Sequence, residues 1–483
     1  MDSEGLPDGW ATCTLGDLIP KPRPKVQADP ASDFPFIGMD HIEADSFHLT
    51  GQARFADMRR AGSYFLPNDI LYGRLRPYLN KVHRAKFEGV ASAEFIVLPS
   101  ADHFDSDFIK YLLHRGQFVD FAMSKSSGDR PRVKFDGIAA YEFALPPLAE
   151  QQRIVEKIET LFAELDKGEE ALREVQKLLA RYRQSVLKAA VTGTLTADWR
   201  AANGPAQESG KDLLARILKT RRETWQGRGK YKEPVEPNTD GLPGLPDGWS
   251  WASLDQLISR VEAGKNYRCE ERPPEADETG IVKISAVTWE EFDEEESKTI
   301  LKADHVDDRY FIQTGDLLIS RANTLELVGA SVVVGDIRRR LQLSDKVLRL
   351  RCVTPIEHWL NFVLRSPLGR GQIERMATGA QMSMRNISQK NLARICIPLP
   401  PKNEIEKLVT KIADLRNVAK RMLETCEYER KRSAALRQSI LKNAFSGKLV
   451  PQDPSDEPAD KLLERIRAAR AEEPKAKRKK ATA

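Results

Sequence analysis

Leu145-Pro-Pro-Leu-Ala-Glu-Gln-Gln-Arg-Ile-Val155 decides the fold, because a Pro-Pro boundary is followed at once by apolar residues at helical spacing. From Glu150 to Ala190 the apolar positions alternate between intervals of four and three residues, and Gly168 breaks the seam. This coiled-coil pattern predicts a continuous helix of roughly 60 Å at about 1.5 Å per residue. The expected seam residues are Ile154, Ile158, Leu161, Leu165, Leu172, Val175, Leu179, Tyr182 and Val186.

The chain repeats this arrangement in its second half. Leu399-Pro-Pro401 leads into Glu404-Ile-Glu-Lys-Leu-Val409, 254 residues after the first boundary. At the same offset Arg183-Gln-Ser-Val-Leu-Lys188 corresponds to Arg437-Gln-Ser-Ile-Leu-Lys442, so this stretch holds no net insertion between the copies. A second long helix is therefore expected, with a seam that small and polar residues weaken near its middle. Its expected seam residues are Leu408, Ile412, Leu415, Met422, Cys426, Leu436 and Ile440.

An identical pentapeptide opens both copies, as Leu6-Pro-Asp-Gly-Trp10 and Leu245-Pro-Asp-Gly-Trp249. The two pentapeptides are 239 residues apart, so the second copy is 15 residues longer between Trp249 and its Pro-Pro boundary. Length has therefore varied in the part before the boundary, while the framework of long helices is shared. A short helical pattern follows each long helix, at Asp212–Ile217 and Asp460–Ile466, and belongs to the repeat as well.

These landmarks predict a division of the chain into six parts. Globular domains are expected at 1–149 and 244–403, long helices at 150–195 and 404–447, a linker with a short helix at 196–243, and a C-terminal segment with a short helix and a basic tail at 448–483. The globular parts mix apolar runs typical of strands with helical stretches at 108–122 and 358–376, which favours an α+β fold. The expected strands are 34–38, 70–72, 94–98, 280–284, 316–319, 331–334 and 346–350.

Length and composition exclude several classes of protein. A chain of 483 residues is too long for one core, and 41% hydrophobic with 30% charged residues is typical of packed domains. No apolar run approaches the roughly 18 residues of a membrane span, and the first residues do not resemble a signal peptide, so a cytoplasmic protein without a membrane partner is expected. The net charge of +5, part of it in the tail Lys475-Ala-Lys-Arg-Lys-Lys480, allows a nucleic-acid partner.

Motifs for catalysis are missing from the sequence. The five cysteines lie far apart and the seven histidines show no metal-ligand spacing, so neither a disulfide framework nor a metal site is expected. No Asp/Asn-Pro-Pro-aromatic motif for amino-group methylation occurs, and the P-loop lookalike at Gly264-Lys265 has Ser259 in place of its first glycine. A noncatalytic chain without a cofactor of its own is therefore expected. An enzyme with a degenerate site is one alternative.

Basic and polar residues recur in one loop of each globular part. The loop at 126–134 carries Arg130, Arg132 and Lys134 at alternate positions, so an extended segment would direct all three toward one face, which suits phosphates and guanine edges. The corresponding loop at 378–386 offers hydrogen bonds with less charge. Its candidate residues are Gln381, Ser383, Arg385 and Asn386. Surface loops whose arginines pair with nearby carboxylates are the alternative interpretation.

Three further arginines are weaker candidates for DNA binding. Arg74 and Arg321 end matching short strands, and this position favours a structural role over base reading. Arg76 lies two residues after the first of them and is weaker still.

In these repeated elements the chain resembles the DNA-specificity (S) subunit of type I restriction-modification systems. The similarity covers nearly the whole length: two target recognition domains, each opening with Leu-Pro-x-Gly-Trp and closing with Pro-Pro-Leu-x-Glu-Gln-x-x-Ile-Val, here Pro146-Pro-Leu-Ala-Glu-Gln-Gln-Arg-Ile-Val155. The second copy departs from that pattern at Lys402-Asn-Glu-Ile-Glu-Lys-Leu-Val409, which has no Gln at position 405.

The resemblance implies an antiparallel coiled coil of the two long helices, lying between two target recognition domains related by pseudo-twofold symmetry. Each domain would bind one half of a bipartite, asymmetric site in double-stranded DNA, and helix length would set the unread gap. The helices would hold two modification subunits, which bring S-adenosylmethionine and methylate adenine N6, and restriction subunits would add ATP- and Mg-dependent translocation and cleavage. A coiled-coil adaptor without DNA contact is the other alternative, but it does not explain two diverged globular domains.

Overall fold

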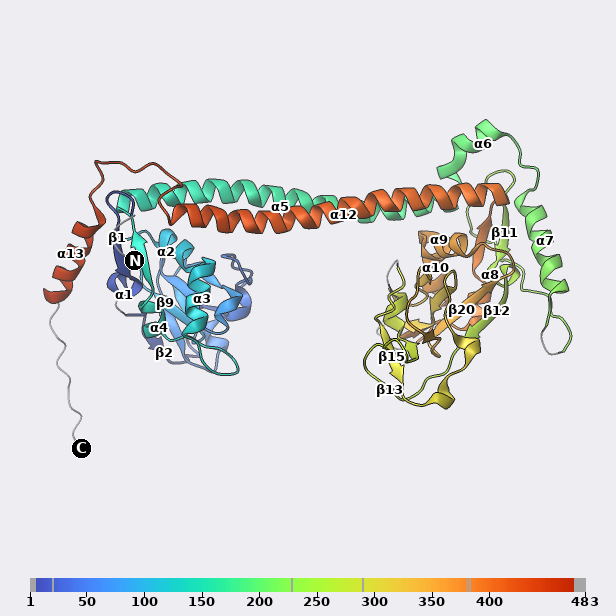
Figure 1. The fold of residues 1–483 in the computed structure, drawn as a ribbon, viewed down its shortest axis with the longest axis horizontal. Helices are drawn as coiled ribbons and strands as arrows, with labels where there is room; N and C mark the ends of the chain where they lie inside the picture. Colours follow the sequence, from blue (N-terminus) through green and yellow to red (C-terminus); the bar gives the residue numbers. More distant parts are fainter. Residues whose placement is uncertain are drawn as a thin grey trace. The chain divides into compact units, whose positions relative to one another are not determined.

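The computed structural model describes residues 6–19, 21–226, 229–288, 291–379, 381 and 384–472 (Figure 1). These residues group into two compact units. The first unit lies within Met1–Arg173 and Glu427–Ala483, and the second within Glu174–Cys426. Segments from the first and the last part of the described sequence therefore contribute to the first unit. No helix among the described residues is long and apolar enough to cross a membrane.

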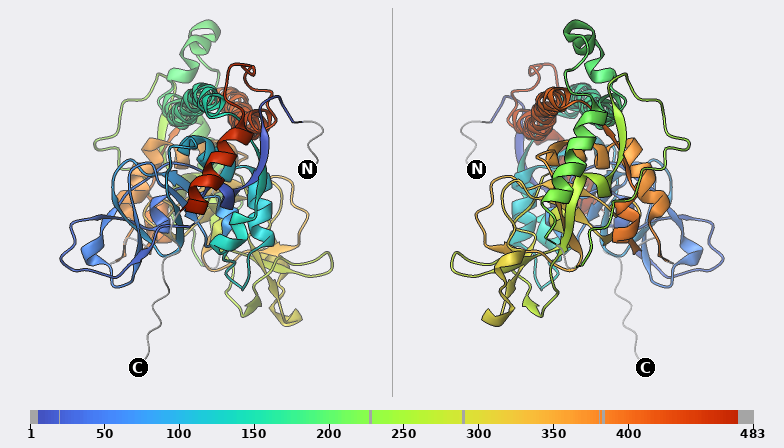
Figure 2. Two further views of the ribbon diagram at one scale, coloured as in Figure 1. Left: turned by 90° about the vertical axis from the view of Figure 1, so that its left-hand side faces the viewer. Right: turned by 90° about the vertical axis from the view of Figure 1, so that its right-hand side faces the viewer.

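Two long helices dominate the secondary structure. Helix α5 spans Leu148–Val191 and α12 spans Lys402–Ala444, each starting directly after a Pro-Pro pair. Each is followed by a glycine with positive φ, Gly193 at 75° and Gly447 at 68°, a conformation that stops a helix at little cost. The two helices run side by side, as the end-on views of Figure 2 show. In the first unit the N-terminal part of α5 meets the C-terminal part of α12, and the second unit contains their other halves.

The first unit is a mixed α/β structure built on three small sheets. Strands β1 (Ala11–Thr14) and β10 (Glu142–Leu145) form an antiparallel pair in which Ala11 lies opposite Leu145. A five-stranded sheet has the order β2 (Lys25–Val26), β5 (Gly62–Phe65), β8 (Gly89–Ser92), β3 (Pro35–Ile37) and β4 (Ala53–Arg54), and a three-stranded sheet the order β7 (Val82–Arg84), β6 (Ile70–Gly73) and β9 (Phe95–Leu98). The shorter helices are α1 (Leu15–Leu18), α2 (Ser106–Leu113), α3 (Gly116–Ser124), α4 (Phe135–Ala139) and α13 (Ala459–Glu472).

The second unit has a similar set of elements. Strands β11 (Ser250–Ser253) and β22 (Cys396–Leu399) form the antiparallel pair next to the long helix. The sheets are β12 (Ile258–Ala263), β20 (Val347–Cys352), β16 (Leu317–Ser320), β18 (Ser331–Val333); β13 (Cys269–Glu270), β15 (Ser297–Ile300), β14 (Gly280–Val282), β19 (Leu341–Gln342); and β17 (Ala322–Asn323) with β21 (Arg385–Asn386). The shorter helices are α6 (Ala197–Asn203), α7 (Gly210–Glu223), α8 (Leu254–Leu257), α9 (Glu357–Arg365), α10 (Pro367–Met376) and α11 (Gln389–Ala393).

Two helical stretches that the sequence predicts as continuous are each two helices. The first, 108–122, is divided between α2 and α3 at Arg115, whose backbone is extended. The second, 358–376, is divided between α9 and α10 because Pro367 has no N–H to continue the first helix. Ser366 instead caps α10 by accepting a hydrogen bond from the amide of Gly369 at 3.2 Å.

The repeated Pro-Asp-Gly-Trp motif has the same contact in both units. The indole N–H of Trp10 donates to Glu150 Oε2 at 3.0 Å, and that of Trp249 donates to Glu404 Oε2 at 2.8 Å. Both carboxylates lie in the first turn of a long helix and are buried. Burial raises the pKa of Glu150 above its ordinary value, although the indole hydrogen bond opposes the shift. The motif therefore fixes each globular domain to the start of its long helix.

The buried line of the long helices differs from the expected seam at three positions. Most of the expected seam residues are buried or half-buried, but the side chains of Tyr182, Met422 and Leu436 are exposed. On α12 the buried residues include the expected Cys426 and, seven residues to either side of it, Ala419 and Ser433, which the expected seam did not contain. Ser433 Oγ donates a hydrogen bond to Glu169 Oε1 at 2.7 Å. The long helices of the first unit are therefore joined by a polar contact at a position where the sequence predicts a weak apolar seam.

The short helices that follow the long ones close the domains. In the second unit the amide of Gly210, at the start of α7, donates to the carbonyl of Gly248 at 2.7 Å, and Leu213 and Ile217 are buried. In the first unit the amide of Ala459, at the start of α13, donates to the carbonyl of Gly9 at 2.9 Å. Each short helix therefore packs against the segment that carries the Pro-Asp-Gly-Trp motif.

Candidate nucleic-acid interface

In the first unit, Arg74, Arg76 and the loop at 126–134 come together at the end of strand β6. The amide of Val133 donates to the carbonyl of Arg74 at 3.1 Å, and the amide of Arg76 donates to the carbonyl of Pro131 at 2.7 Å. Arg76 has a φ of 51°, in the left-handed region, and is exposed. The candidates of the first domain therefore form one group at the end of a buried strand.

The loop at 126–134 is a tight turn and not the extended segment that the sequence predicts. Ser127 and Arg132 exchange backbone hydrogen bonds of 3.3 and 3.2 Å, and the chain reverses between them through Gly128, whose φ is 88°. Alternation along the sequence consequently does not direct the three basic side chains toward one face. Arg130 lies exposed in the turn, and Lys134 is exposed just before α4.

Arg132 makes an ion pair with Glu94. Its Nε and Nη2 atoms lie 3.0 and 2.9 Å from the two carboxylate oxygens, a bidentate arrangement. The hydrogen bonds from Arg132 lower the pKa of Glu94, and the carboxylate raises the pKa of Arg132. Arg132 thus matches the alternative interpretation of a locally paired arginine, whereas Arg130 and Lys134 make no such ion pair with the described residues.

In the second unit, the corresponding group lies at the end of strand β16. The amide of Arg321 donates to the carbonyl of Lys346 at 2.8 Å, and the amide of Ile387 donates to the carbonyl of Arg321 at 3.0 Å. Strand β17 then pairs with β21, which places Asn323 opposite Arg385 and Ala322 opposite Asn386. Gln381 is exposed, and Ser383 lies outside the described residues.

This group surrounds a half-open cleft of about 440 Å³. The cleft is lined by Ile284, Arg321, Ala322, Asn323, Asp345, Lys346, Met384 and Asn386. Sequence reasoning missed Asn323, Asp345 and Lys346. Asn323 could have been suspected from its position two residues after Arg321. The other residues of the cleft come next to it only through the pairing of β17 with β21.

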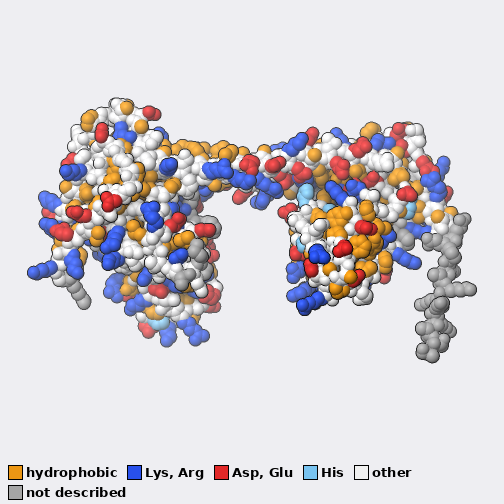
Figure 3. Space-filling model, turned by 180° about the vertical axis from the view of Figure 1, so that it is seen from behind, with side chains coloured by type: hydrophobic (Ala, Val, Ile, Leu, Met, Phe, Trp, Pro, Cys, Tyr) orange, Lys and Arg blue, Asp and Glu red, His pale blue; other side chains and the backbone are white. Residues whose placement is uncertain are grey.

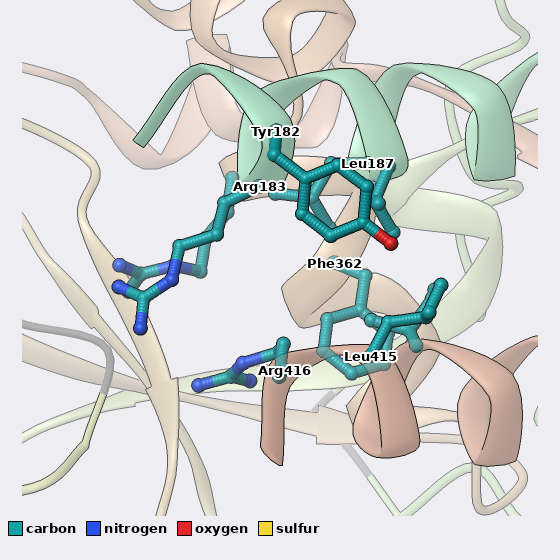
Figure 4. A pocket seen from close by; sticks show the side chains of 9 residues that line it. Tyr182, Arg183, Leu187, Phe362, Leu415 and Arg416 are labelled. Carbon is teal, nitrogen blue, oxygen red and sulfur yellow. The ribbon is translucent and has the colours of Figure 1, made fainter. Parts of the chain in front are cut away.

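A second pocket lies where helix α9 of the domain meets the long helices (Figure 4). Tyr182, Leu187, Phe362 and Leu415 supply its apolar wall, and Arg183 and Arg416 extend from the long helices to one side of it. Its volume of about 20 Å³ is close to that of a single water molecule. The pocket is therefore a packing gap at the base of the second domain.

The cysteines and potential metal ligands do not gather into a site within the described ranges. No group of three or more His, Cys, Asp or Glu side chains there could hold a metal ion. Burial raises the pKa of the Cys13 thiol to about 12, and it also raises the pKa of Cys352. Burial therefore disfavours the reactive thiolate form of both side chains.

Comparison with known proteins assigns a family to the first domain and shows what the whole chain resembles. Residues 7–174 match the family described as type I restriction modification DNA specificity domain. The EcoEI specificity subunit of Escherichia coli is 25% identical over 472 residues, which cover 86% of this chain and 78% of the relative. The EcoDI specificity subunit of Escherichia coli is 24% identical over 498 residues, which cover 98% of this chain and 97% of the relative.

A solved structure has the same fold. It belongs to a study of the structural basis of complex assembly and conformational transition of the type I R-M system, and it aligns with a TM-score of 0.61 over 92% of this chain and 99% of its own, at 19% identity. The first domain is accordingly a DNA specificity domain. Over most of its length the chain is similar to specificity subunits of type I restriction-modification systems.

Proposed function

We propose that this chain selects a bipartite, asymmetric DNA site, with one half bound by each domain, and directs modification and restriction subunits to it. The observation that carries the proposal is a construction present in both units: an arginine follows a central strand, and backbone hydrogen bonds hold it to a neighbouring loop. The loops differ in charge, since Arg130 and Lys134 belong to one and Gln381 and Asn386 to the other. Two domains that share a fold but carry different loops are suited to binding two different half-sites.

The chain is proposed to consist of two target recognition domains, 1–149 and 244–403, separated by an antiparallel coiled coil of the helices at 150–195 and 404–447. The linker at 196–243 and the segment at 448–483 complete the pseudo-twofold repeat. The repeated contacts of Trp10 with Glu150 and of Trp249 with Glu404 support this division, because each anchors a domain to one end of the helical spacer. Helix length would then set the gap between the half-sites.

The modification subunits are proposed to dock on the long helices. Figure 3 shows hydrophobic side chains gathered along part of these helices. In the second unit the exposed members are Leu178, Tyr182, Val418 and Met422. Four large apolar side chains exposed on two adjacent helices indicate a surface that a protein partner covers. Two modification subunits would correspond to the two halves of the repeat.

The chemistry is assigned to the partner subunits, because the sequence has no motif for methyl transfer or for nucleotide binding. S-adenosylmethionine would belong to the modification subunits, and ATP and Mg to restriction subunits. The specificity subunit itself would act as a noncatalytic reader in the cytoplasm, where the complex meets double-stranded DNA. A coiled-coil adaptor without DNA contact is disfavoured, because residues 7–174 match a DNA specificity domain.

The first test is a domain exchange read out by methylation. The chain is co-expressed with the modification subunit encoded nearest to it, and methylated adenines are mapped by long-read sequencing. A split motif that requires the chain is expected. Replacing residues 1–149 by another recognition domain should change one half of this motif and leave the other half intact. The exchange of residues 244–403 is the matched control and should change the opposite half. Methylation that does not depend on the chain, or an exchange that changes both halves, contradicts the proposal.

Charge reversal of the first loop should weaken DNA binding. Arg130→Glu combined with Lys134→Glu turns two cations into anions on an exposed turn. If both contact phosphates, the slope of log K against log salt flattens by about 2, and affinity at low salt falls at least about tenfold. Fluorescence anisotropy with duplex DNA at several salt concentrations measures both quantities in the assembled complex. Arg216→Glu, on helix α7, is the control for a change of net charge elsewhere. An unchanged salt slope removes these two residues from the interface.

A further inference from the structure

The side chain of Arg321 has no local partner within the part of the chain that the structure describes. Its Nε atom is buried and makes no hydrogen bond there, and the side chain lines the cleft of the second domain. Backbone hydrogen bonds on both sides, from its amide to Lys346 and from the amide of Ile387 to its carbonyl, fix where the side chain begins. The guanidinium is therefore positioned at the cleft, and its buried Nε–H group has no acceptor among the described residues.

Structural arginines of this unit are paired in a different way. Arg349 donates hydrogen bonds through Nε to Glu262 at 2.6 Å and through Nη1 to Asp316 at 2.8 Å. Arg370 donates through Nη1 to the carbonyl of Val328 at 2.6 Å. A buried N–H group left without an acceptor costs free energy unless a ligand or water supplies one. The contrast with Arg349 and Arg370 indicates that Arg321 serves a ligand rather than the fold.

The other polar side chains of the cleft indicate the chemistry of that ligand. Asn323 and Asn386 carry carboxamides, Lys346 an ammonium group and Asp345 a carboxylate. A surface that binds phosphates needs only hydrogen-bond donors and positive charge, and the carboxylate of Asp345 would repel a phosphate group. The edges of bases instead present hydrogen-bond donors and acceptors together. Carboxamides pair with adenine, carboxylates accept from cytosine, and arginine donates to guanine. The cleft therefore suits the edges of bases.

The same position recurs in the first unit. Arg74 follows β6 as Arg321 follows β16, the amide of Val133 donates to its carbonyl, and its Nε is likewise buried without a hydrogen-bond partner among the described residues. Arg132 of the adjacent loop is already paired with Glu94. The expectation that Arg74 and Arg321 are mainly structural is thus not what the contacts favour.

We propose that Arg321 reads a guanine in the half-site of the second domain, through N–H donors directed at O6 and N7, with Asn323 and Asn386 contacting the neighbouring bases. This inference rests on the proposed function. Arg74 takes the corresponding place in the first domain. A planar guanidinium can donate two parallel hydrogen bonds to guanine, which the ammonium group of lysine cannot reproduce in the same geometry.

The test replaces Arg321 by alanine and by lysine in the full chain, co-expressed with the modification subunit, and compares methylation at all sites that differ from the wild-type motif at one base. Both variants should accept other bases at one guanine position of the second half-site, with discrimination there reduced roughly 5- to 150-fold. The first half-site should stay unchanged. Arg74→Ala should relax one position of the first half-site, and Arg216→Ala, a paired arginine on α7, should leave both halves unchanged.

Two results would overturn the inference. If Arg321→Lys behaves as wild type while Arg321→Ala lowers methylation equally at every site, Arg321 contacts a phosphate. If all positions keep their discrimination in both variants, the cleft does not read bases. A thermal unfolding midpoint equal to that of the wild type shows that the second unit is folded, so loss of folding cannot imitate either result. Failure of the proposed function has a different signature, because the wild-type chain then produces no split motif.

Discussion

Replacing Arg349 by alanine is expected to destabilise the second unit by about 3–5 kcal/mol, because removing one partner of a buried ion pair leaves its carboxylates without compensation. The side chain is 1% exposed, and its guanidinium contacts Asp316 and Glu262 as well as the carbonyls of Arg309 and Phe311. Burial opposes ionisation of Glu262, but hydrogen bonds from Arg260 and Arg349 outweigh it and lower the pKa. Without Arg349, buried Asp316 keeps Arg351, a more exposed arginine, as its charged partner within the described part of the chain.

Urea unfolding of the full chain measures this effect through tryptophan fluorescence. Trp10 is the one tryptophan of the first unit, whereas Trp249, Trp251 and Trp359 belong to the second, so the signal reports mainly on the second unit. Arg351→Ala is the matched control: it pairs with the same two carboxylates but is one third exposed, and a loss of about 1 kcal/mol or less is expected. Equal losses for the two variants would show that burial of Arg349 is not what stabilises this network.

Local patterns predicted the two long helices and seven of the strands. The spacing of apolar residues after each Pro-Pro pair gave the starts of α5 and α12 to within two residues, and the apolar runs at 70–72 and 331–334 lie in β6 and β18. These features depend on neighbours a few residues apart, which the sequence displays directly. The break between α9 and α10 was also local, since Pro367 marks it, but the apolar pattern continues across it.

Local sequence patterns could not predict contacts between residues that are far apart in the sequence. Arg132 meets Glu94 across 38 residues, and the cleft combines Asn323 of β17 with Asn386 of β21. Neither pairing leaves a trace in spacing or composition. The buried line of α12 was misjudged for a related reason: Ala419 and Ser433 weaken a seam judged by hydrophobicity alone, but small residues let two helices approach closely. The recurrence of Pro-Asp-Gly-Trp indicated a shared framework without revealing its contact to the long helix.

Removal of the chain after Pro451 is expected to unfold much of the first unit while the second unit stays folded. Helix α13 packs against α1, and its side chains Leu462, Leu463 and Ile466 are buried in the same cluster as Trp10, Leu15 and Leu18. Truncating one buried leucine to alanine costs about 2–5 kcal/mol, so loss of three buried aliphatic side chains rivals the total stability of an ordinary domain of about 5–15 kcal/mol. The truncation also removes Asp456, whose carboxylate lies 2.6 Å from Arg153.

Limited proteolysis with mass spectrometry distinguishes this expectation from that of a dispensable C-terminal segment. Early cleavage should fall within 6–145 in the truncated chain, and Leu463→Ala should produce the same pattern more weakly. Leu213→Ala, at the equivalent place on α7, should instead sensitise 250–399, because α7 closes the second unit as α13 closes the first. Protection of 6–145 in the truncated chain would contradict the contact between α13 and α1. Helix α13 therefore completes a domain whose other elements lie near the start of the sequence, and if each domain binds one half-site as proposed, loss of α13 should impair binding of the first half-site.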